Sequence, residues 1–447
     1  MRRAIAKRAG GALVPSVVLA LALAGCAPTF AFTTTAPSEQ SRATIAAQPA
    51  GPTPVKPSDP VQVRAENGRL ASVMVTGPKG ALAGDLSADG TTWTMQPGSL
   101  GYGASYRIEA TAIDSRGVPV STVAQFQTIE PEEFFVGEVS PEQGSTVGVG
   151  MPITVTFSRF IKDKGAVERA MVVRTPQSIE GAWSWQSNRI VEFRPRTYWP
   201  GNIEVTVELN LTGVEGSPGV FGSTDSATSF SFGPSMVTKV DADAYQATVY
   251  RDGQPIRTMP ITTGKAGFET RSGIKVILSK ERSRIMDAAS GGTSRSDPDY
   301  YRVLAEYAMR ITPSGEFVHA APWSVGYQGR ANVSHGCVGM STSDAAWLYE
   351  RSMVGDVVEV TGTPREQNLG NGITIWNESW DEWLAGSATG AVWTTSVEDS
   401  TTGPVASPSG TPDPSVTTVP SATPALPMAI PSALATTTQN RSPSTGT

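Results

Sequence analysis

The chain contains at residues 334–341 the stretch Ser334-His335-Gly336-Cys337-Val338-Gly339-Met340-Ser341. A second stretch, at residues 317–323, reads Phe317-Val318-His319-Ala320-Ala321-Pro322-Trp323. The protein has only two histidines and two cysteines among its 447 residues, and three of these four lie between His319 and Cys337. Gathering such scarce and reactive side chains in one short span indicates a functional site, and the rest of the sequence is interpreted outward from it.

Cysteine and histidine together suit nucleophilic catalysis. A thiolate is the reactive form of cysteine, and an imidazole can take the thiol proton and later return it to a leaving amine. His335 lies two residues from Cys337, where an extended strand gives poor contact geometry, whereas His319 lies on a separate run, 316–320, that can pair beside the cysteine. We therefore predict His319 as the general base. We assign His335 and Gly336 to oxyanion or substrate contacts, since glycine lets a carbonyl approach the backbone closely.

The regions before this site are rich in turn residues and short alternating runs. Residues 61–130 and 131–233 each contain such runs, among them 106–112 in the first region and 203–209 in the second. Both segments predict an all-β sandwich. Pro97 and Gly103 match Pro195 and Gly201 in their spacing, and each pair leads into a strand, which favours a duplication.

The remaining chain divides into three parts. Residues 234–362 predict a β-rich domain with one short helix at Ser343–Arg351, capped by Thr342 or Ser343. Residues 363–386 predict a packing extension, because Trp376, Trp380 and Trp383 fall at helical spacings. Residues 387–447 are rich in Ser, Thr, Pro and Ala and predict a disordered tail.

The N-terminus has the features of an export signal. Four basic residues lie within residues 2–8, an apolar run follows over 11–24, and the segment ends in Leu23-Ala24-Gly25-Cys26. This ending resembles the bacterial lipobox, which implies cleavage after residue 25 and a lipid on Cys26. Residues 26–60 would then be a flexible tether. We expect an exported lipoprotein on the outer face of the membrane, reaching into the wall, with Cys337 left without a disulfide partner.

With His319 upstream, the element Ser334-His335-Gly336-Cys337-Val338 resembles the signature of the L,D-transpeptidase (YkuD-type) family. The resemblance, strongest to mycobacterial lipoprotein-type members, extends to four further stretches: 285–288, 301–302, 314–326 and 380–386. It covers residues 60–386 and implies a mainly β fold, in which two immunoglobulin-like sandwiches precede a β-rich catalytic domain.

The resemblance also implies an activity. Cys337 would attack a peptidoglycan tetrapeptide stem, release D-Ala as a thioester forms, and pass the acyl group to a second stem in a 3→3 cross-link. Carbapenems would acylate the same thiol, and no cofactor or nucleic acid is implied. The net charge of −6 agrees with the absence of a nucleic-acid surface. The substrate-binding positions carried over from the family are Met286, Tyr301, Ser314, Gly315, Trp323 and Gly339.

Two positions depart from the family pattern, and alternatives stay open. Ala320 replaces a frequent Ser, although the family uses the backbone carbonyl there, and Gly339 replaces a frequent Asn or Arg, which removes a side-chain contact. Cys337 with both histidines also suits a catalytic zinc site with water as the fourth ligand. A non-catalytic wall-binding protein, with Cys337 a buried and inert thiol, is a further alternative.

Overall fold

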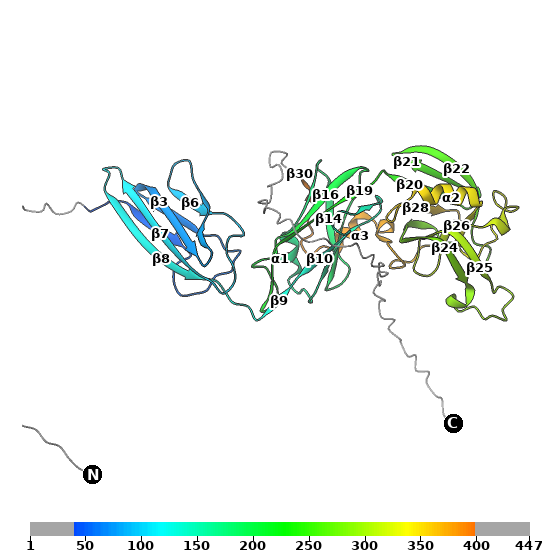
Figure 1. Ribbon diagram of the computed structural model, residues 1–447, viewed down its shortest axis with the longest axis horizontal. Helices are drawn as coiled ribbons and strands as arrows, with labels where there is room; N and C mark the ends of the chain where they lie inside the picture. Colours follow the sequence, from blue (N-terminus) through cyan, green and yellow to red (C-terminus); the bar gives the residue numbers. More distant parts are fainter. Residues whose placement is uncertain (1–39, 398–447) are drawn as a thin grey trace, which may run out of the picture. The chain divides into compact units, whose positions relative to one another are not determined.

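The structure is a computed structural model and describes residues 40–397. Two β-sandwiches precede a third β-rich domain (Figure 1). The predicted fold class, mainly β with two immunoglobulin-like domains before the catalytic domain, is confirmed. The predictions for the signal peptide over 1–25, for Cys26 and for residues 398–447 lie outside the described residues.

The first sandwich consists of two antiparallel four-stranded sheets. One sheet has the order β1 (Thr44–Gln48), β2 (Gln62–Glu66), β6 (Thr92–Met95), β5 (Gly84–Leu86). The other has the order β4 (Gly80–Leu82), β3 (Gly68–Gly77), β7 (Ser105–Asp114), β8 (Pro119–Gln127). Along β7 every second side chain, beginning at Tyr106, is buried between the sheets, which is the alternation expected of a sandwich strand.

The first sandwich begins earlier in the chain than predicted. Strand β1 pairs with β2 from Thr44 to Gln48, and Ala43 is buried in the core. The prediction of a flexible tether over 26–60 is therefore wrong for residues 40–60. The strand escaped detection because it lies at a sheet edge and none of its side chains is fully buried, and Ile45 is its only large apolar residue, so it gives little hydrophobic alternation.

The second sandwich has two five-stranded sheets. The first has the order β10 (Gly137–Ser140), β12 (Ile153–Phe157), β15 (Ile190–Pro195), β14 (Glu180–Trp185), β29 (Trp393–Thr394). The second has the order β11 (Thr146–Val147), β19 (Ser226–Phe232), β16 (Ile203–Leu209), β13 (Met171–Thr175), β30 (Ser396–Val397). A small sheet of β17 (Glu215–Ser217), β18 (Val220–Gly222) and β9 (Glu133–Phe135) and the short helix α1 (Lys164–Arg169) complete this domain.

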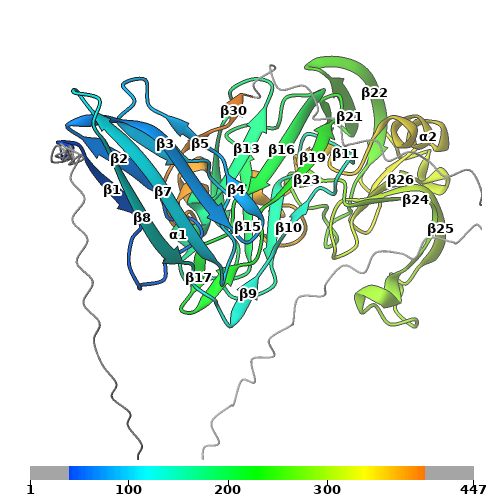
Figure 2. The same cartoon turned by 60° about the vertical axis from the view of Figure 1, so that its left-hand side comes forward.

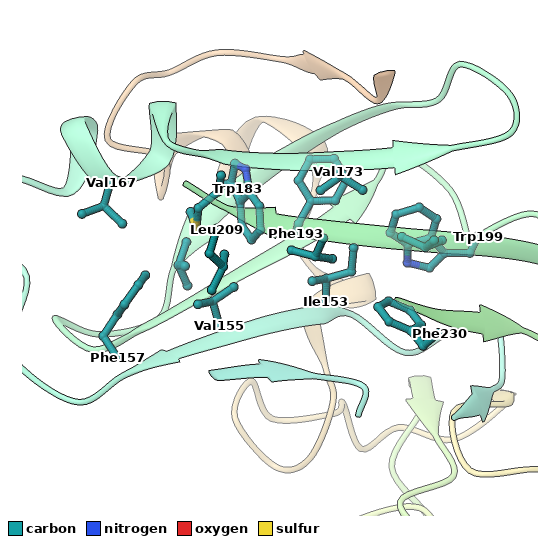
Figure 3. Close-up of a cluster of buried hydrophobic side chains, with 14 of the residues drawn as sticks. Ile153, Val155, Phe157, Val167, Val173, Trp183, Phe193, Trp199, Leu209 and Phe230 are labelled. Carbon is teal, nitrogen blue, oxygen red and sulfur yellow. The ribbon is translucent and has the colours of Figure 1, made fainter. Parts of the chain in front are cut away.

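Aromatic side chains fill the core of the second sandwich. Trp183, Phe193 and Trp199 lie at its centre, between aliphatic side chains that include Ile153 and Val155 (Figure 3). The ring centroids of Trp183 and Phe193 are 5.1 Å apart, and those of Phe193 and Trp199 are 6.0 Å apart. Rings at these separations are in contact, and each buries a large apolar area, so they contribute much of the stability of this domain.

The third domain is built on one nine-stranded sheet. Its order is β23 (Gly273–Val276), β28 (Val357–Thr361), β20 (Met236–Asp241), β21 (Gln246–Arg251), β22 (Gln254–Thr262), β27 (Val338–Met340), β26 (Phe317–Ala320), β25 (Arg302–Arg310), β24 (Ser279–Asp287). Neighbouring strands are antiparallel except for the parallel pairs β20–β28 and β26–β27. The second of these parallel pairs carries His319 and the residues that follow Cys337.

Helix α2 (Thr342–Arg351) packs against β25 and β26 (Figure 2). It begins one residue before the predicted helix, and its N-cap is Ser341, whose side chain accepts a hydrogen bond from the Asp344 N–H at 3.1 Å. The predicted capping by Thr342 or Ser343 is wrong. Only Ser341 separates the helix from β27, so the helix fixes the C-terminal end of the strand that follows Cys337.

The C-terminal extension returns to the second sandwich. It contains η3 (Ile375–Asn377) and α3 (Trp380–Ala385), so the three tryptophans lie on two short helices rather than on one predicted stripe. They pack around Arg194, whose guanidinium carbon lies 4.9–5.6 Å from the three ring centroids. Strands β29 and β30 then pair with β14 and β13, so the prediction of a disordered tail over 387–447 is wrong for residues 387–397.

Candidate active site

Strands β26 and β27 bring His319 and Cys337 to one cavity. In their parallel register His319 lies opposite Gly339, two residues beyond Cys337, and side chains two apart on a strand share a face. Both residues line a cavity of about 250 Å³, together with residues from β24, β25 and the loops that flank β26 and β27. The sequence prediction that the run 316–320 pairs beside the cysteine segment agrees with this register.

The side chain of Cys337 is largely buried. The residue is 7% exposed and forms no disulfide. Its thiol donates to the Gly315 carbonyl across 3.7 Å, and the Phe317 N–H hydrogen-bonds to the sulfur from the same segment. Burial raises the pKa of the thiol to about 11, which outweighs the opposing effect of the Phe317 N–H. The thiol therefore needs a base to become a nucleophile at neutral pH.

A hydrogen bond to the backbone fixes the tautomer of His319. Its Nδ1 lies 2.7 Å from the Ala320 carbonyl oxygen, which only accepts hydrogen bonds, so Nδ1 carries the proton of the neutral ring. Nε2 is then left to accept a proton. Burial lowers the pKa of His319, with the Ala320 carbonyl acting in the opposite direction. The partner of Nδ1 is a backbone carbonyl, so the contact is kept although this chain has Ala320 where many family members have Ser.

The His335 ring also lines the cavity and packs against two aromatic side chains. It lies edge-on to Phe268, with centroids 4.7 Å apart, and 4.9 Å from the ring of Tyr301. Its Nε2 is 3.5 Å from an Asp299 carboxylate oxygen, which also pairs with the Lys265 ammonium. These contacts join the cysteine segment to the loop between β24 and β25, which contains the 3₁₀ helix η1 (Ala288–Gly291).

Gly336 forms a turn that only glycine adopts easily. Its φ is +114°, a region that disfavours residues with a Cβ. Its N–H donates to the Ser334 hydroxyl at 3.1 Å, and that hydroxyl donates to the Cys337 carbonyl at 2.6 Å. Its carbonyl accepts from the buried Thr270 hydroxyl at 2.9 Å. The Gly336 N–H, predicted as an oxyanion donor, is thus already engaged by Ser334.

Four of the six predicted substrate-binding residues line the cavity, namely Met286, Tyr301, Trp323 and Gly339. Met286 is buried, whereas Trp323 is half-exposed and its ring lies 5.9 Å from that of His319. Burial raises the pKa of Tyr301 to about 12, so its hydroxyl stays a hydrogen-bond donor. The cavity thus combines apolar walls with polar groups that converge on the sulfur, as ligand sites commonly do.

Ser314 and Gly315 do not line this cavity. The Ser314 hydroxyl accepts from the Asn371 amide at 3.0 Å and lies on an exposed turn. Gly315 contacts Cys337 only through its carbonyl.

The glycine at 339 has a packing reason. A Cβ built there would lie 2.9 Å from the Ala321 Cβ and 3.2 Å from a Thr262 methyl group, which is too close for a side chain without movement.

The sequence analysis missed two groups of residues. Polar and apolar cavity walls come from Thr262, Val303, Ala321, Ser324, Val333 and Ser334. A buried charged cluster of Arg271, Lys275 and Glu316 lies behind Cys337. Glu316 had a signal, since it is an acidic residue at the entry of an apolar strand. Lys275 had none, because β23 is distant from this segment in the sequence and in the sheet order, and only the folded domain brings the two side chains together.

Two features are absent from residues 40–397. Within this range no three His, Cys, Asp or Glu side chains are grouped so that they would hold a metal ion. None of the helices in the same range has the length and apolar character needed to cross a bilayer.

Comparisons with known proteins agree with the architecture. Residues 52–215 match a bacterial Ig domain, and residues 236–360 match an L,D-transpeptidase catalytic domain. L,D-transpeptidase 2 of Mycobacterium tuberculosis (strain CDC 1551 / Oshkosh) is 38% identical over 331 residues, which cover 74% of this chain and 81% of that protein. L,D-transpeptidase 5 of Mycobacterium tuberculosis (strain ATCC 25618 / H37Rv) is 33% identical over 343 residues, which cover 75% of this chain and 74% of that protein.

A solved structure is also similar in sequence over half of this chain. The structure of LD transpeptidase LdtMt1 in complex with imipenem is 38% identical, covers 50% of this chain and 97% of that one, and has a TM-score of 0.43. The family predicted from the cysteine motif is confirmed by the sequence relatives. With a relative of this identity matched over most of its length, the chain belongs to the L,D-transpeptidase family.

Proposed function

We propose that this protein forms 3→3 cross-links in peptidoglycan, with Cys337 as nucleophile and His319 as general base. The observation that carries the proposal is the position of His319 on the strand paired with the cysteine strand. There its Nδ1 proton is held by the Ala320 carbonyl, and both residues line one cavity. A base oriented by a third group beside a nucleophile is the arrangement that covalent acyl transfer requires.

In the first half-reaction, Nε2 of His319 takes the Cys337 proton. The sulfur attacks the carbonyl between the third residue of a tetrapeptide stem and its terminal D-Ala. The carbon–nitrogen bond then breaks, His319 returns the proton to the departing amine, and D-Ala leaves as a thioester remains on Cys337. Both groups begin uncharged, because burial raises the pKa of the thiol to about 11 and lowers that of His319. Proton transfer and attack therefore occur together.

In the second half-reaction, the side-chain amine of a neighbouring stem's diamino acid attacks the thioester carbonyl. The carbon–sulfur bond breaks, an amide bond forms, and the amine's proton passes through His319 to the sulfur, which restores the starting state. Water in place of the amine would give a carboxypeptidase product. The Cys337 N–H and the His335 ring are the proposed oxyanion or substrate contacts, since Ser334 already holds the Gly336 N–H.

The cavity walls suit a peptide stem. We propose that Tyr301 and Met286 cover the donor stem from the side of the β24–β25 loop, while Trp323 borders it near His319. Gly339 leaves the floor open. Ser314 and Gly315 lie outside the cavity, so contacts with them would involve a part of the stem beyond it.

Carbapenem binding is the first test of this mechanism. The relative LdtMt1 is described in complex with imipenem. Mixing the purified full-length protein with imipenem is expected to add one carbapenem mass to the peptide that contains Cys337, because the strained lactam carbonyl replaces the stem carbonyl. Peptide mass spectrometry after digestion measures this adduct.

The control for that test is the same reaction after iodoacetamide treatment and, separately, in EDTA. Alkylation should prevent the adduct, whereas the chelator should leave it unchanged. Folded protein that gains no mass on the Cys337 peptide would contradict the thiol mechanism, and EDTA sensitivity would favour the zinc alternative.

The location is a further part of the proposal. We propose that Cys26 carries a lipid anchor on the outer face of the membrane, and that the two sandwiches hold the catalytic domain within the wall. The support is the basic and apolar N-terminal sequence that ends at Cys26. In bacterial cells the mature protein should partition into the detergent phase, and Cys26→Ala should move it to the aqueous phase. Equal partitioning of the two proteins would contradict lipidation.

A further inference from the structure

A buried cluster of charges lies behind Cys337. The Glu316 carboxylate accepts from the Arg271 backbone N–H and guanidinium, both at 3.0 Å, and lies 2.9 Å from the Lys275 ammonium. The Lys275 side chain is fully buried and that of Glu316 is 5% exposed. Lys275 also donates to the Arg271 carbonyl at 2.5 Å. Buried charges need such partners, since isolated ones lose their hydration without compensation.

The cluster is joined to the sulfur through one short segment. Glu316 is the residue between Gly315, whose carbonyl accepts from the thiol, and Phe317, whose N–H hydrogen-bonds to the sulfur. The Glu316 backbone N–H is itself held by the buried Thr312 hydroxyl at 2.9 Å. Its carboxylate pairs with Arg271 and Lys275, and Glu316 does not line the cavity. The ion pairs therefore fix the two backbone groups that contact the nucleophile.

The cluster also acts on the charge of the sulfur. Two cations oppose one carboxylate, so the cluster carries an excess positive charge close to a buried thiol. Glu316 disfavours the thiolate, and Lys275 and Arg310 favour it, although burial has the larger effect on the pKa of Cys337. The ionisable groups that face the sulfur are Glu316, Lys275 and Arg310 behind it, and Tyr301, His319 and His335 across the cavity.

We propose that Lys275 and Glu316 are positioning residues for the Cys337 nucleophile. Glu316 fixes the Gly315–Phe317 backbone against the sulfur, and the buried Lys275 ammonium offsets the Glu316 charge and favours the thiolate that forms as acylation begins. This inference rests on the proposed function of Cys337. The inferred role is an effect on the ionisation of the Cys337 thiol, which an ion pair far from the sulfur would not have.

The test is the pH dependence of Cys337 alkylation by iodoacetamide in the full-length protein. Glu316→Gln keeps an acceptor for Arg271 but removes the negative charge, so the midpoint should move down by about 1 pH unit. Lys275→Met keeps the side-chain length but removes the positive charge, so the midpoint should move up by a similar amount. The rate is measured by mass spectrometry of the Cys337 peptide, since Cys26 is a second thiol.

Lys239→Met is the matched control, because Lys239 forms an ion pair with Glu359 at 3.2 Å on β20 and does not line the cavity. Its midpoint should equal that of the wild type. Opposite shifts of the midpoint in the two cluster variants support the proposal. Loosened packing alone would shift both midpoints in the same direction, whichever charge was removed.

If Lys275→Met does not fold, as judged by thermal unfolding, Glu316→Gln decides alone. A folded Glu316→Gln protein with an unchanged or raised midpoint overturns the positioning role. The proposed function is tested separately by the carbapenem adduct on the wild-type thiol. Adduct formation with unshifted midpoints would reject only the inference about the cluster, and absence of the adduct would reject the mechanism itself.

Discussion

Cys337→Ala is expected to lower the rate of D-Ala release from a tetrapeptide stem by about 10³-fold or more. The sulfur is the atom on which the proposed thioester forms, and no other cysteine lies among residues 40–397. Without the nucleophile no thioester can form. Binding of the stem and the presence of the base then contribute little to the rate. The assay incubates a defined tetrapeptide with an acceptor stem and quantifies cross-linked dimer, tripeptide and D-Ala by mass spectrometry.

Loss of activity has to be separated from loss of the fold. Cys337 packs in a small buried cluster with Met286, Ala305, Ala308 and Phe317. Cys337→Ser fills nearly the same space and serves as the matched variant, and both proteins should unfold within a few degrees of the wild type. A folded Cys337→Ala protein that keeps cross-linking within tenfold of the wild type would contradict the mechanism. It would favour the non-catalytic, wall-binding alternative.

The sandwiches were predictable because their strands alternate strongly. Along 203–209 every second residue is apolar, and three of these four, Val205, Val207 and Leu209, are the buried residues of β16. The pieces that were missed lack this pattern. Strand β1 has half-buried small residues at a sheet edge, and β29 and β30 are two-residue strands in a sequence of tail-like composition. Their order depends on pairing with strands that come from distant parts of the sequence.

The candidate site divides in the same way. Cys337 and His319 were identified from scarcity and from a motif, which are properties of the sequence itself. The engaged state of the Gly336 N–H and the position of Ser314 outside the cavity depend on local hydrogen bonds that no spacing reveals. Lys275 was invisible because five strands lie between β23 and β26 in the sheet order. Only the folded arrangement shows that its side chain reaches Glu316.

His319→Gln is expected to slow carbapenem acylation of Cys337 by about 10²- to 10⁴-fold at pH 7. Glutamine keeps a hydrogen-bonding side chain of similar reach but cannot take a proton. Without the base, the thiol must lose its proton to water, and burial has raised its pKa to about 11. The acylation rate is measured across a range of pH by quenching samples at set times and recording the intact mass, and peptide mapping locates the adduct at Cys337.

The pH profile gives this prediction its sign. In the wild type the rate should fall only where the His319 imidazole becomes protonated, and since burial lowers the pKa of His319, that fall lies below the usual histidine value of about 6.5. In His319→Gln the acidic fall should vanish, and the rate should rise with pH toward the thiol pKa, so the defect shrinks in alkali. His335→Gln is the matched variant for the other histidine of the cavity and should keep the wild-type acidic limb. An acidic limb that persists in His319→Gln but disappears in His335→Gln would reverse the assignment of the base.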